Sequence, residues 1–244
     1  MPAAAAPVVR VFPSSLALST ALAQRVLEVA RESIEVRGTF TVALAGGDTP
    51  RAAYELLGNR DDAIEWGKVH VFFTDERFVP PEDPRNNAAM AMRAWLSRVA
   101  IPPRQVHAIP TLDGTPASCA SRYERTLRSE MPAAGAHTLD LALMGIGADG
   151  HTASLFPGDA SALSQRDRWV VAVHAPPGTE PRERITLTLP VLNRSRRVVF
   201  AAAGVGKRHR VAESLAGSNL PAAMVRGLES TEWLLDDGAA PAGR

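Results

Sequence analysis

The sequence predicts a single α/β domain, built as three layers (αβα) around a mainly parallel, Rossmann-like open sheet. Short β-branched, apolar segments alternate with amphipathic segments of helical length along most of the 244 residues. This alternation is typical of a parallel sheet that carries helices on both faces. Chains of about 250 residues commonly form one such domain, and no change in composition marks a linker. We therefore expect one domain over residues 1–244, with loose tails at 1–10 and 236–244.

The first half of the chain opens with a helix. Ser14 and Ser15 can cap it, apolar residues recur at helical spacing as far as residue 36, and Gly38 ends it. An apolar, β-branched strand follows at 39–44, and Pro50 suits the first turn of a helix that ends at residue 57. The next expected elements are a strand at 69–73, a loop rich in proline and charge at 75–87, and a helix at 87–99.

The second half repeats the alternation. Thr115 can cap a helix that ends at residue 129, and Pro116 fits its first turn. A buried strand at 139–144 then leads into a loop rich in glycine. The remaining expected elements are strands at 169–173, 185–189 and 198–202, and a helix at 206–215.

Charge and cysteine content exclude several classes of function. The chain has 27 Lys and Arg against 26 Asp and Glu, a net charge of +1, so no basic field points to nucleic acid or a membrane surface. A single cysteine, Cys119, excludes an intrachain disulfide and a zinc site built from cysteines. No apolar run approaches the ~20 residues of a membrane span, and the N-terminus has no signal-peptide pattern. We expect a cytoplasmic monomer or weak homodimer that acts on a small molecule.

In open α/β sheets, ligands bind beyond the carboxyl ends of the strands, and a glycine turn follows the first strand there. Gly46 and Gly47 allow close approach of the backbone, and the helix that starts at Asp48 and Thr49 offers free N–H groups to an anion. These features fit a phosphate cradle, although the turn is neither a Walker A loop nor a GxGxxG motif. An ordinary turn capped by Asp48 or Thr49 has the same sequence pattern.

Three charged residues, Asp75, Glu76 and Arg77, follow the second strand. Their position at a strand end suits them to hold substrate hydroxyl groups, and a solvated loop is the alternative. Asn86 and Asn87 open the next helix, where either residue could cap it or hydrogen-bond a polyol.

The loop after the third strand carries the strongest signal. Asp149 and His151 flank Gly150 in a segment that contains several glycines. Histidine is the usual general base near neutral pH, and a carboxylate two residues away can orient its ring. The alternative is that His151 only caps or packs against the loop. His70 and His174 lie within strands and are expected to be structural.

Two cations occur late in the chain at strand ends. Arg184 begins a strand, and Lys207 follows a strand in a glycine turn. Both could bind a phosphate, arginine through its fork and lysine as a point charge, although solvated surface charges are the alternative. Cys119 is expected to be a buried hydrophobic residue, and Ser154 lacks the GxSxG context of a serine nucleophile. No clustered spacing of metal ligands is present, so neither a metal nor an organic cofactor is expected.

Taken in order, these segments resemble the 6-phosphogluconolactonase family over about residues 11–235. The motifs are GGDTP at 46–50, TDER at 74–77 with Asn87, GIGADGHTASLFP at 145–157, RITLT at 184–188, and Gly206-Lys207. Glucosamine-6-phosphate deaminase/isomerase is a related family with the same Asp-Gly-His core. In that family a glutamate follows the histidine, whereas 152–157 contains no carboxylate here.

The resemblance implies a hydrolase that opens 6-phospho-D-glucono-1,5-lactone to 6-phospho-D-gluconate in the oxidative pentose phosphate pathway. It implies that His151 deprotonates the attacking water, that Asp149 orients His151, and that Arg77 stabilises the developing oxyanion. A deaminase/isomerase-like enzyme and a non-catalytic sensor of sugar phosphates are the alternatives. The residues expected around the phosphate are Gly46, Gly47, Asp48, Thr49, Arg184 and Lys207, those facing the sugar hydroxyls are Asp75, Glu76 and Asn87, and Gly147 is expected to line the substrate site.

Overall fold

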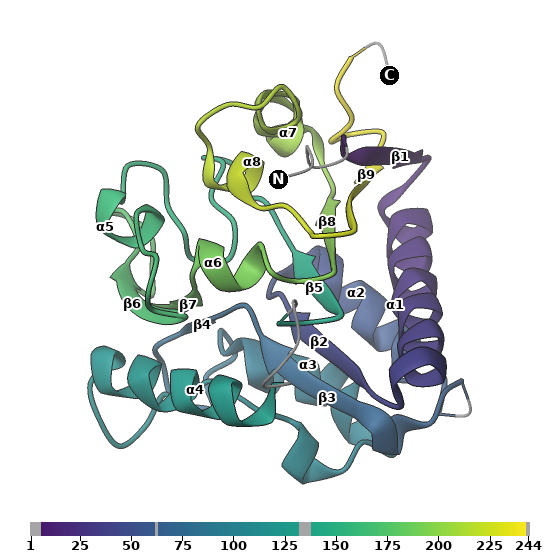
Figure 1. Cartoon of the computed structure of the whole chain (residues 1–244). Helices are drawn as coiled ribbons and strands as arrows, with labels where there is room; N and C mark the ends of the chain where they lie inside the picture. The colour runs from purple at the N-terminus through teal and green to yellow at the C-terminus, as the bar shows by residue number, and fades with distance from the viewer. Residues whose placement is uncertain (1–5, 62, 132–137, 243–244) are drawn as a thin grey trace.

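A six-stranded sheet runs through the middle of the computed structural model, which describes residues 6–61, 63–131 and 138–242 (Figure 1). All neighbouring strands of this sheet are parallel. The prediction of an α/β fold around a mainly parallel open sheet is therefore confirmed. In spatial order the strands are β1 (Val8–Phe12), β9 (Ser230–Asp236), β8 (Arg197–Ala202), β5 (Leu141–Met144), β2 (Phe40–Leu44) and β3 (Val69–Phe73).

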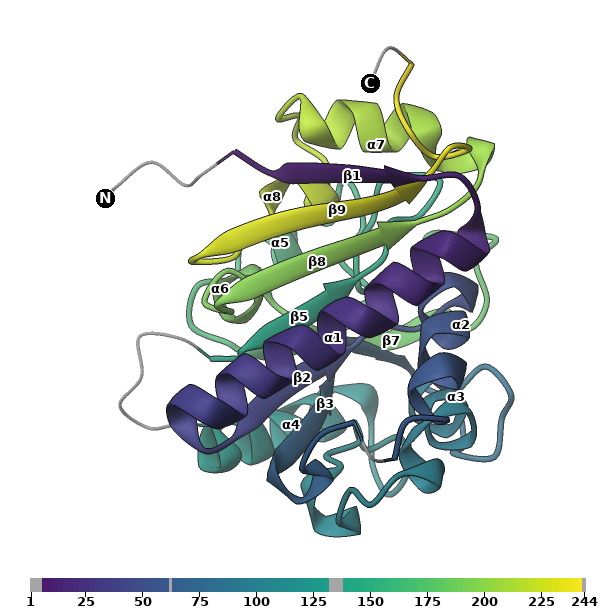
Figure 2. The same ribbon diagram turned by 90° about the vertical axis from the view of Figure 1, so that its right-hand side faces the viewer.

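The helices α1 (Ser15–Arg37) and α2 (Asp48–Leu57) cover one face of this sheet (Figure 2). Both ends of α1 have the expected caps. Ser14 accepts a hydrogen bond from the Ala17 N–H, and Gly38, with φ of 77°, donates its own N–H to Ile34. Glycine adopts this left-handed conformation without the penalty of a Cβ atom.

A second, smaller sheet lies on the opposite side and is antiparallel. Its strands are β4 (Asp75–Arg77), β7 (Glu183–Leu187) and β6 (Val170–His174), and α4 (Pro116–Glu130) packs against β6 and β7. The sequence predicted β6 and β7 as strands but not that they leave the main sheet. It predicted a loop where β4 lies, because a strand of three charged residues has no apolar pattern.

Two of the shorter helices have different boundaries from those that the sequence predicts. The helix expected at 87–99 is α3 (Asn87–Ala94), which ends at Trp95 and continues as a 3₁₀ turn at Leu96–Arg98. The helix expected at 206–215 begins as a 3₁₀ turn at Val205–Lys207 and continues as α7 (Arg208–Leu215). The other short helices are α5 (Ala160–Leu163), α6 (Leu189–Leu192) and α8 (Pro221–Met224).

The two ends of the chain differ from the sequence prediction. Residues 8–10, expected in a loose tail, belong to β1, which pairs with β9 at the edge of the sheet. The segment expected to be loose from residue 236 is packed instead: Asp236 ends β9 and accepts the N–H groups of Gly204 and Ala239, and Ala239 is fully buried. The tail prediction is therefore wrong for these residues, and residues 1–5 and 243–244 lie outside the described part.

Apolar side chains from both sheets form one continuous core. The five residues of β2 are all buried, as expected for a strand covered on both faces. Cys119 is a fully buried free thiol, as predicted. Among the described residues, the helices are too short or too polar to cross a membrane.

The order of the strands determines where polar residues gather. β8, β5, β2 and β3 are parallel neighbours, so the segments that follow their carboxyl ends meet at one edge of the sheet. These segments carry Lys207, His151, the glycine turn at 46–47, and Asp75, respectively.

Candidate active site

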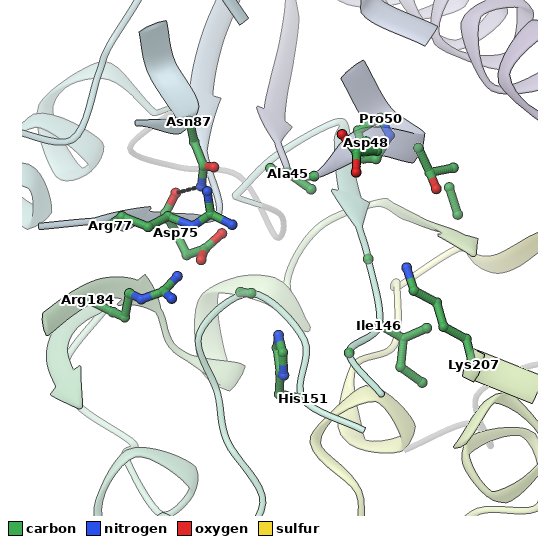
Figure 3. A pocket seen from close by; sticks show the side chains of 17 residues that line it. Ala45, Asp48, Pro50, Asp75, Arg77, Asn87, Ile146, His151, Arg184 and Lys207 are labelled. Atoms are coloured by element: carbon green, nitrogen blue, oxygen red, sulfur yellow. Dashed lines mark hydrogen bonds between the residues drawn. The ribbon is translucent and has the colours of Figure 1, made fainter. Parts of the chain in front are cut away.

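A pocket opens at this edge, and most of the predicted site residues line it (Figure 3). Besides the four strand ends, β4, β7 and the start of α3 contribute to the lining. The structure brings together eleven predicted residues: Gly46, Gly47, Asp48, Thr49, Asp75, Arg77, Asn87, Gly147, His151, Arg184 and Lys207. Asp149 and Glu76 do not line the pocket. The lining also includes small or apolar residues that the sequence did not single out, namely Ala45, Pro50, Gly145, Ile146, Ala153 and Ala201.

His151 and Asp149 form a hydrogen-bonded pair in the loop after β5. The Asp149 Oδ1 atom lies 2.6 Å from Nδ1 of His151 and also accepts the His151 backbone N–H at 3.1 Å. Because Nδ1 is bound to the carboxylate, Nε2 of the ring is the atom left for a substrate or a water molecule. The His151 side chain is 32% exposed, and it points into the pocket (Figure 3).

The charge of Asp149 is stabilised by its partner. Burial opposes ionisation, but the hydrogen bonds from the ring and the backbone N–H of His151 outweigh it and hold the pKa of Asp149 below its usual range. The carboxylate is therefore ionised at neutral pH. An ionised partner on Nδ1 fixes the orientation of the imidazole.

Gly147 makes room for this pair. A Cβ atom at residue 147 would lie 2.2 Å from two ring atoms of His151 and 2.7 Å from Oδ1 of Asp149. Any side chain would thus displace the imidazole or the carboxylate. The loop is closed by backbone bonds from the Gly147 N–H to the His151 carbonyl and from the Gly150 N–H to the Gly147 carbonyl.

The glycine turn after β2 presents the start of α2 to the pocket. Gly47 precedes the helix with φ of 103°, a conformation that favours glycine, and no side chain caps the helix there. The first N–H groups of α2 therefore face a space that an anion can occupy. Thr49 adds a hydroxyl group at the same end of the pocket.

Gly46 allows Asn87 to reach into the pocket. A Cβ atom at residue 46 would lie 2.0 Å from Oδ1 of Asn87. The Asn87 amide donates to the carbonyl of Asp75 at 3.0 Å, and its buried Oδ1 has no hydrogen-bond partner within the described part of the chain. An unpaired buried acceptor that borders a cavity is suited to a ligand hydroxyl.

Asp75 and Glu76 have different environments although they are adjacent. Asp75 lines the pocket, and one of its carboxylate oxygens accepts a 2.7 Å hydrogen bond from the Ser154 hydroxyl. Glu76 is fully buried and accepts the backbone N–H groups of Arg77, Asn87 and Ala88 at 2.7–2.9 Å. The prediction that Glu76 faces the sugar is therefore wrong, because its carboxylate holds the start of α3.

Arg77 and Arg184 lie opposite each other on β4 and β7. The Arg184 side chain is almost completely buried, and its Nε donates to the carbonyl of Pro181 at 2.7 Å. Burial lowers the pKa of Arg184, Arg77 lowers it further, and Asp75 and Glu76 oppose both effects. Two cations held this close favour an anion between them.

Lys207 lies across the pocket from the two arginines, near Asp48 at the start of α2 (Figure 3). Burial lowers the pKa of its ammonium group, and Asp48 and Asp236 partly oppose this effect. The sequence grouped Arg184 with Lys207 around one phosphate. The structure instead divides the cations between two ends of the pocket, with His151 between them (Figure 3).

Proteins of one family resemble this chain in both sequence and fold. A family model described as glucosamine-6-phosphate isomerases/6-phosphogluconolactonase matches residues 13–233. Proteins named 6-phosphogluconolactonase from Nostoc sp. and Mycobacterium tuberculosis are 38% and 39% identical to this chain, and each match covers 95% of the chain and 96% of the relative. The crystal structure of 6-phosphogluconolactonase from Thermotoga maritima has a TM-score of 0.83 at 31% identity, covering 95% of this chain and 100% of that one. The chain belongs to the family of glucosamine-6-phosphate isomerases and 6-phosphogluconolactonases.

Proposed function

We propose that this protein hydrolyses 6-phospho-D-glucono-1,5-lactone to 6-phospho-D-gluconate in the oxidative pentose phosphate pathway. The observation that carries the proposal is the imidazole of His151, which is hydrogen-bonded to Asp149 and points into a pocket with a cationic group at each end. The names of the relatives support the same substrate. The segment at 152–157 supports lactone hydrolysis over deamination, because it has no carboxylate for the proton transfers of an amino sugar.

The phosphate of the substrate binds at the Lys207 end of the pocket. Lys207, the hydroxyl of Thr49 and the first N–H groups of α2 supply charge and donors there, with Gly46, Gly47 and Asp48 forming the turn. This assignment leaves Arg77 and Arg184 for the lactone carbonyl. Their planar forks match a carboxylate and the oxyanion that precedes it.

Hydrolysis needs one proton acceptor and one group that stabilises negative charge. Nε2 of His151 takes a proton from a water molecule, whose oxygen forms a bond to C1 of the lactone. Arg77, aided by Arg184, stabilises the negative charge that develops on the carbonyl oxygen. The C1–O5 bond then breaks, and O5 receives the proton from His151. Asp149 holds the ring in position through both transfers.

The sugar hydroxyl groups contact the wall between the two ends. Asp75 accepts hydrogen bonds from hydroxyl groups and is itself held by Ser154. The unpaired Oδ1 of Asn87 accepts a hydrogen bond from another hydroxyl group. Gly147 lies beside the reacting centre, where the absence of a side chain leaves space for His151. No step of this reaction calls for a metal or an organic cofactor.

We also infer that the whole chain is one domain that works in the cytoplasm as a monomer or weak homodimer. The continuous core that joins both sheets supports a single domain. The net charge of +1 supports a small-molecule substrate over nucleic acid.

The test is hydrolysis of freshly generated lactone by the purified protein, measured against spontaneous hydrolysis at the same pH. We expect rapid formation of 6-phosphogluconate and no release of ammonia from glucosamine 6-phosphate. Ammonia release would assign the chain to the isomerase branch of its family. Tight binding of 6-phosphogluconate without turnover of the lactone would instead indicate a sensor.

A further inference from the structure

Three side chains able to bind a metal meet at the edge of the main sheet. His70 lies on β3, His107 lies on the segment that runs beside β3, and Glu130 is the last residue of α4. One nitrogen or oxygen atom from each of them lies within 4.8 Å of the other two. None of the three lines the pocket that contains His151.

The two imidazole rings meet edge to edge. Nε2 of His107 lies 3.4 Å from Nδ1 of His70. The ring centroids are 5.7 Å apart and the ring planes differ by only 10°, so these two nitrogens lie between the rings and face each other.

The distance between the nitrogens favours a shared ion over a direct hydrogen bond. Hydrogen bonds from N–H groups are usually about 2.9–3.0 Å long, so 3.4 Å is long for an N–H···N bond. Two nitrogens bound at about 2.0–2.1 Å to a tetrahedral zinc ion lie roughly 3.3–3.4 Å apart. Each ring would turn by roughly 35° to direct both lone pairs at one ion, because a tetrahedral ion holds its ligands about 109° apart.

The backbone and an aromatic neighbour hold the histidines in place. The His107 N–H donates to the carbonyl of Val71 at 2.8 Å, and Val106 forms a parallel bridge with Val71. The ring of Phe72 stacks on His107 at 4.6 Å between centroids. The His107 imidazole is therefore held close to its position before an ion binds.

The carboxylate of Glu130 brings a negative charge to the two half-buried imidazoles, and this charge favours a cation. The positive charge of Arg104 acts on His70 in the opposite sense but less strongly. The exposed side chain of Glu130 can move the short distance needed to complete the site.

We propose that His70, His107 and Glu130 bind one divalent transition-metal ion, with Zn²⁺ preferred and water as the fourth ligand. Two imidazoles and a carboxylate are a ligand set that Zn²⁺ accepts at tetrahedral geometry. The bound ion links the end of α4 to β3, the edge strand of the main sheet. Because it binds the folded chain, it stabilises the fold.

The proposal is tested by titrating the metal-free full-length protein with Zn²⁺ alone, followed by calorimetry, and with Co²⁺, followed by visible absorption. We expect one saturable site per chain and the strong absorption of tetrahedral Co²⁺. His70→Gln and Glu130→Gln should each weaken binding at least tenfold, since losing even an indirect partner of a metal ligand costs about 10–100-fold in affinity. His174→Gln, at an exposed histidine on β6, should bind like the unmodified chain.

Zn²⁺ should also raise the melting temperature of the unmodified chain and of His174→Gln, but not of the other two variants. If His70→Gln fails to fold, Glu130→Gln still tests the site, because residue 130 is exposed at a helix end. Absence of saturable binding, or equal affinity in all variants, would overturn the proposal. Neither readout involves the lactone, so this result is independent of the function proposed for the pocket.

Discussion

The surroundings of His151 differ from those of the His70–His107 pair. His151 has a carboxylate partner two residues away in one glycine-rich loop, and its second nitrogen faces a pocket. His70 and His107 come from segments 37 residues apart and face each other. A single imidazole tied to a carboxylate is prepared to move a proton, whereas two imidazoles that face each other are prepared to hold an ion.

The neighbouring charges also differ between the two sites. Arg77, Arg184 and Lys207 surround the pocket of His151 and favour an anionic ligand there. The other pair has a carboxylate oxygen of Glu130 within 4.8 Å, which favours a cation and acts on His70 more strongly than the positive charge of Arg104 does. The same side chain is thus suited to different chemistry according to its second partner and the sign of the nearby charge.

Replacing His151 by alanine should cause the largest loss of turnover. Removal of a general base typically costs about 10²–10⁴-fold in rate, and the variant should still fold and bind 6-phosphogluconate. The measurement is kcat/KM on fresh lactone for the variant and the unmodified enzyme, corrected for spontaneous hydrolysis.

His174→Gln is the matched control for this variant, because His174 is exposed and lies outside the pocket. It should retain full turnover. If His151→Ala turned over substrate at nearly the unmodified rate, the general-base role would pass to Asp75, the carboxylate that lines the same pocket.

The cations at the two ends of the pocket should give different kinetic effects. Lys207→Ala should mainly raise KM, because the phosphate is remote from the lactone carbonyl, whereas Arg184→Ala should also lower kcat. A hydrogen bond to a charged group contributes about 1.5–3 kcal/mol, which corresponds to roughly a 10- to 150-fold change in kcat/KM. Steady-state kinetics on fresh lactone measures both values.

Lys68→Ala, at a lysine that lies outside the pocket and pairs with Glu65, is the control for loss of positive charge and should leave both constants unchanged. A pure KM effect in Arg184→Ala would restore the original prediction that this residue binds phosphate together with Lys207. Unchanged kinetics in both pocket variants would remove them from the site.

Asp149→Asn should have a smaller effect than loss of the imidazole. The variant keeps the ring but replaces an ionised partner by a neutral one. We expect kcat to fall about tenfold, which corresponds to the free energy of one hydrogen bond to a charged group. The measurements are kcat and the midpoint of urea unfolding, each for the variant and for the unmodified enzyme. A lower midpoint with an unchanged kcat would mean that Asp149 only closes its loop.

The pocket could be predicted because its signals are local in the sequence. The glycines that precede α2 and those that surround His151 come directly after strands, so the rule for parallel sheets places them at one edge. The partnership of Asp149 with His151 follows from a separation of two residues. The sequence does not reveal that Gly46 leaves space for the Asn87 side chain and Gly147 for that of His151, because this depends on how the loops fold and pack.

Features that depend on distant pairing could not be predicted. β1 joins the sheet through β9, from the far end of the chain, and a short Pro/Ala-flanked strand gives little signal alone. The position of Arg184 beside Arg77 depends on the antiparallel pairing of β4 with β7. Likewise, the spacing of His70, His107 and Glu130 matches no compact metal motif, because three separate elements supply them.

Glu76→Gln should have the smallest effect on turnover and act on stability instead. The Glu76 carboxylate accepts three backbone N–H groups, two of them at the start of α3. An amide offers one acceptor oxygen, so at least one buried N–H would lose its partner. The expected cost is about 1–3 kcal/mol in the free energy of unfolding, while kcat and KM change little. Glu65→Gln, at an exposed glutamate, should cost almost nothing.

The pH dependence of this cost separates a structural role from a substrate contact. Burial, which outweighs the three N–H bonds, raises the pKa of Glu76 from 4.5 to about 7. Between pH 4.5 and 7 the folded chain holds a proton on Glu76 that the unfolded chain has lost. The tighter binding of this proton stabilises the folded chain fully below pH 4.5, and the stabilisation is lost as the pH rises through 7. Glu76→Gln has no such titration, and its destabilisation should therefore be larger at pH 5 than at pH 8 in urea unfolding. Equal stability of the variant and the unmodified chain at both pH values, together with a raised KM, would return Glu76 to the substrate site.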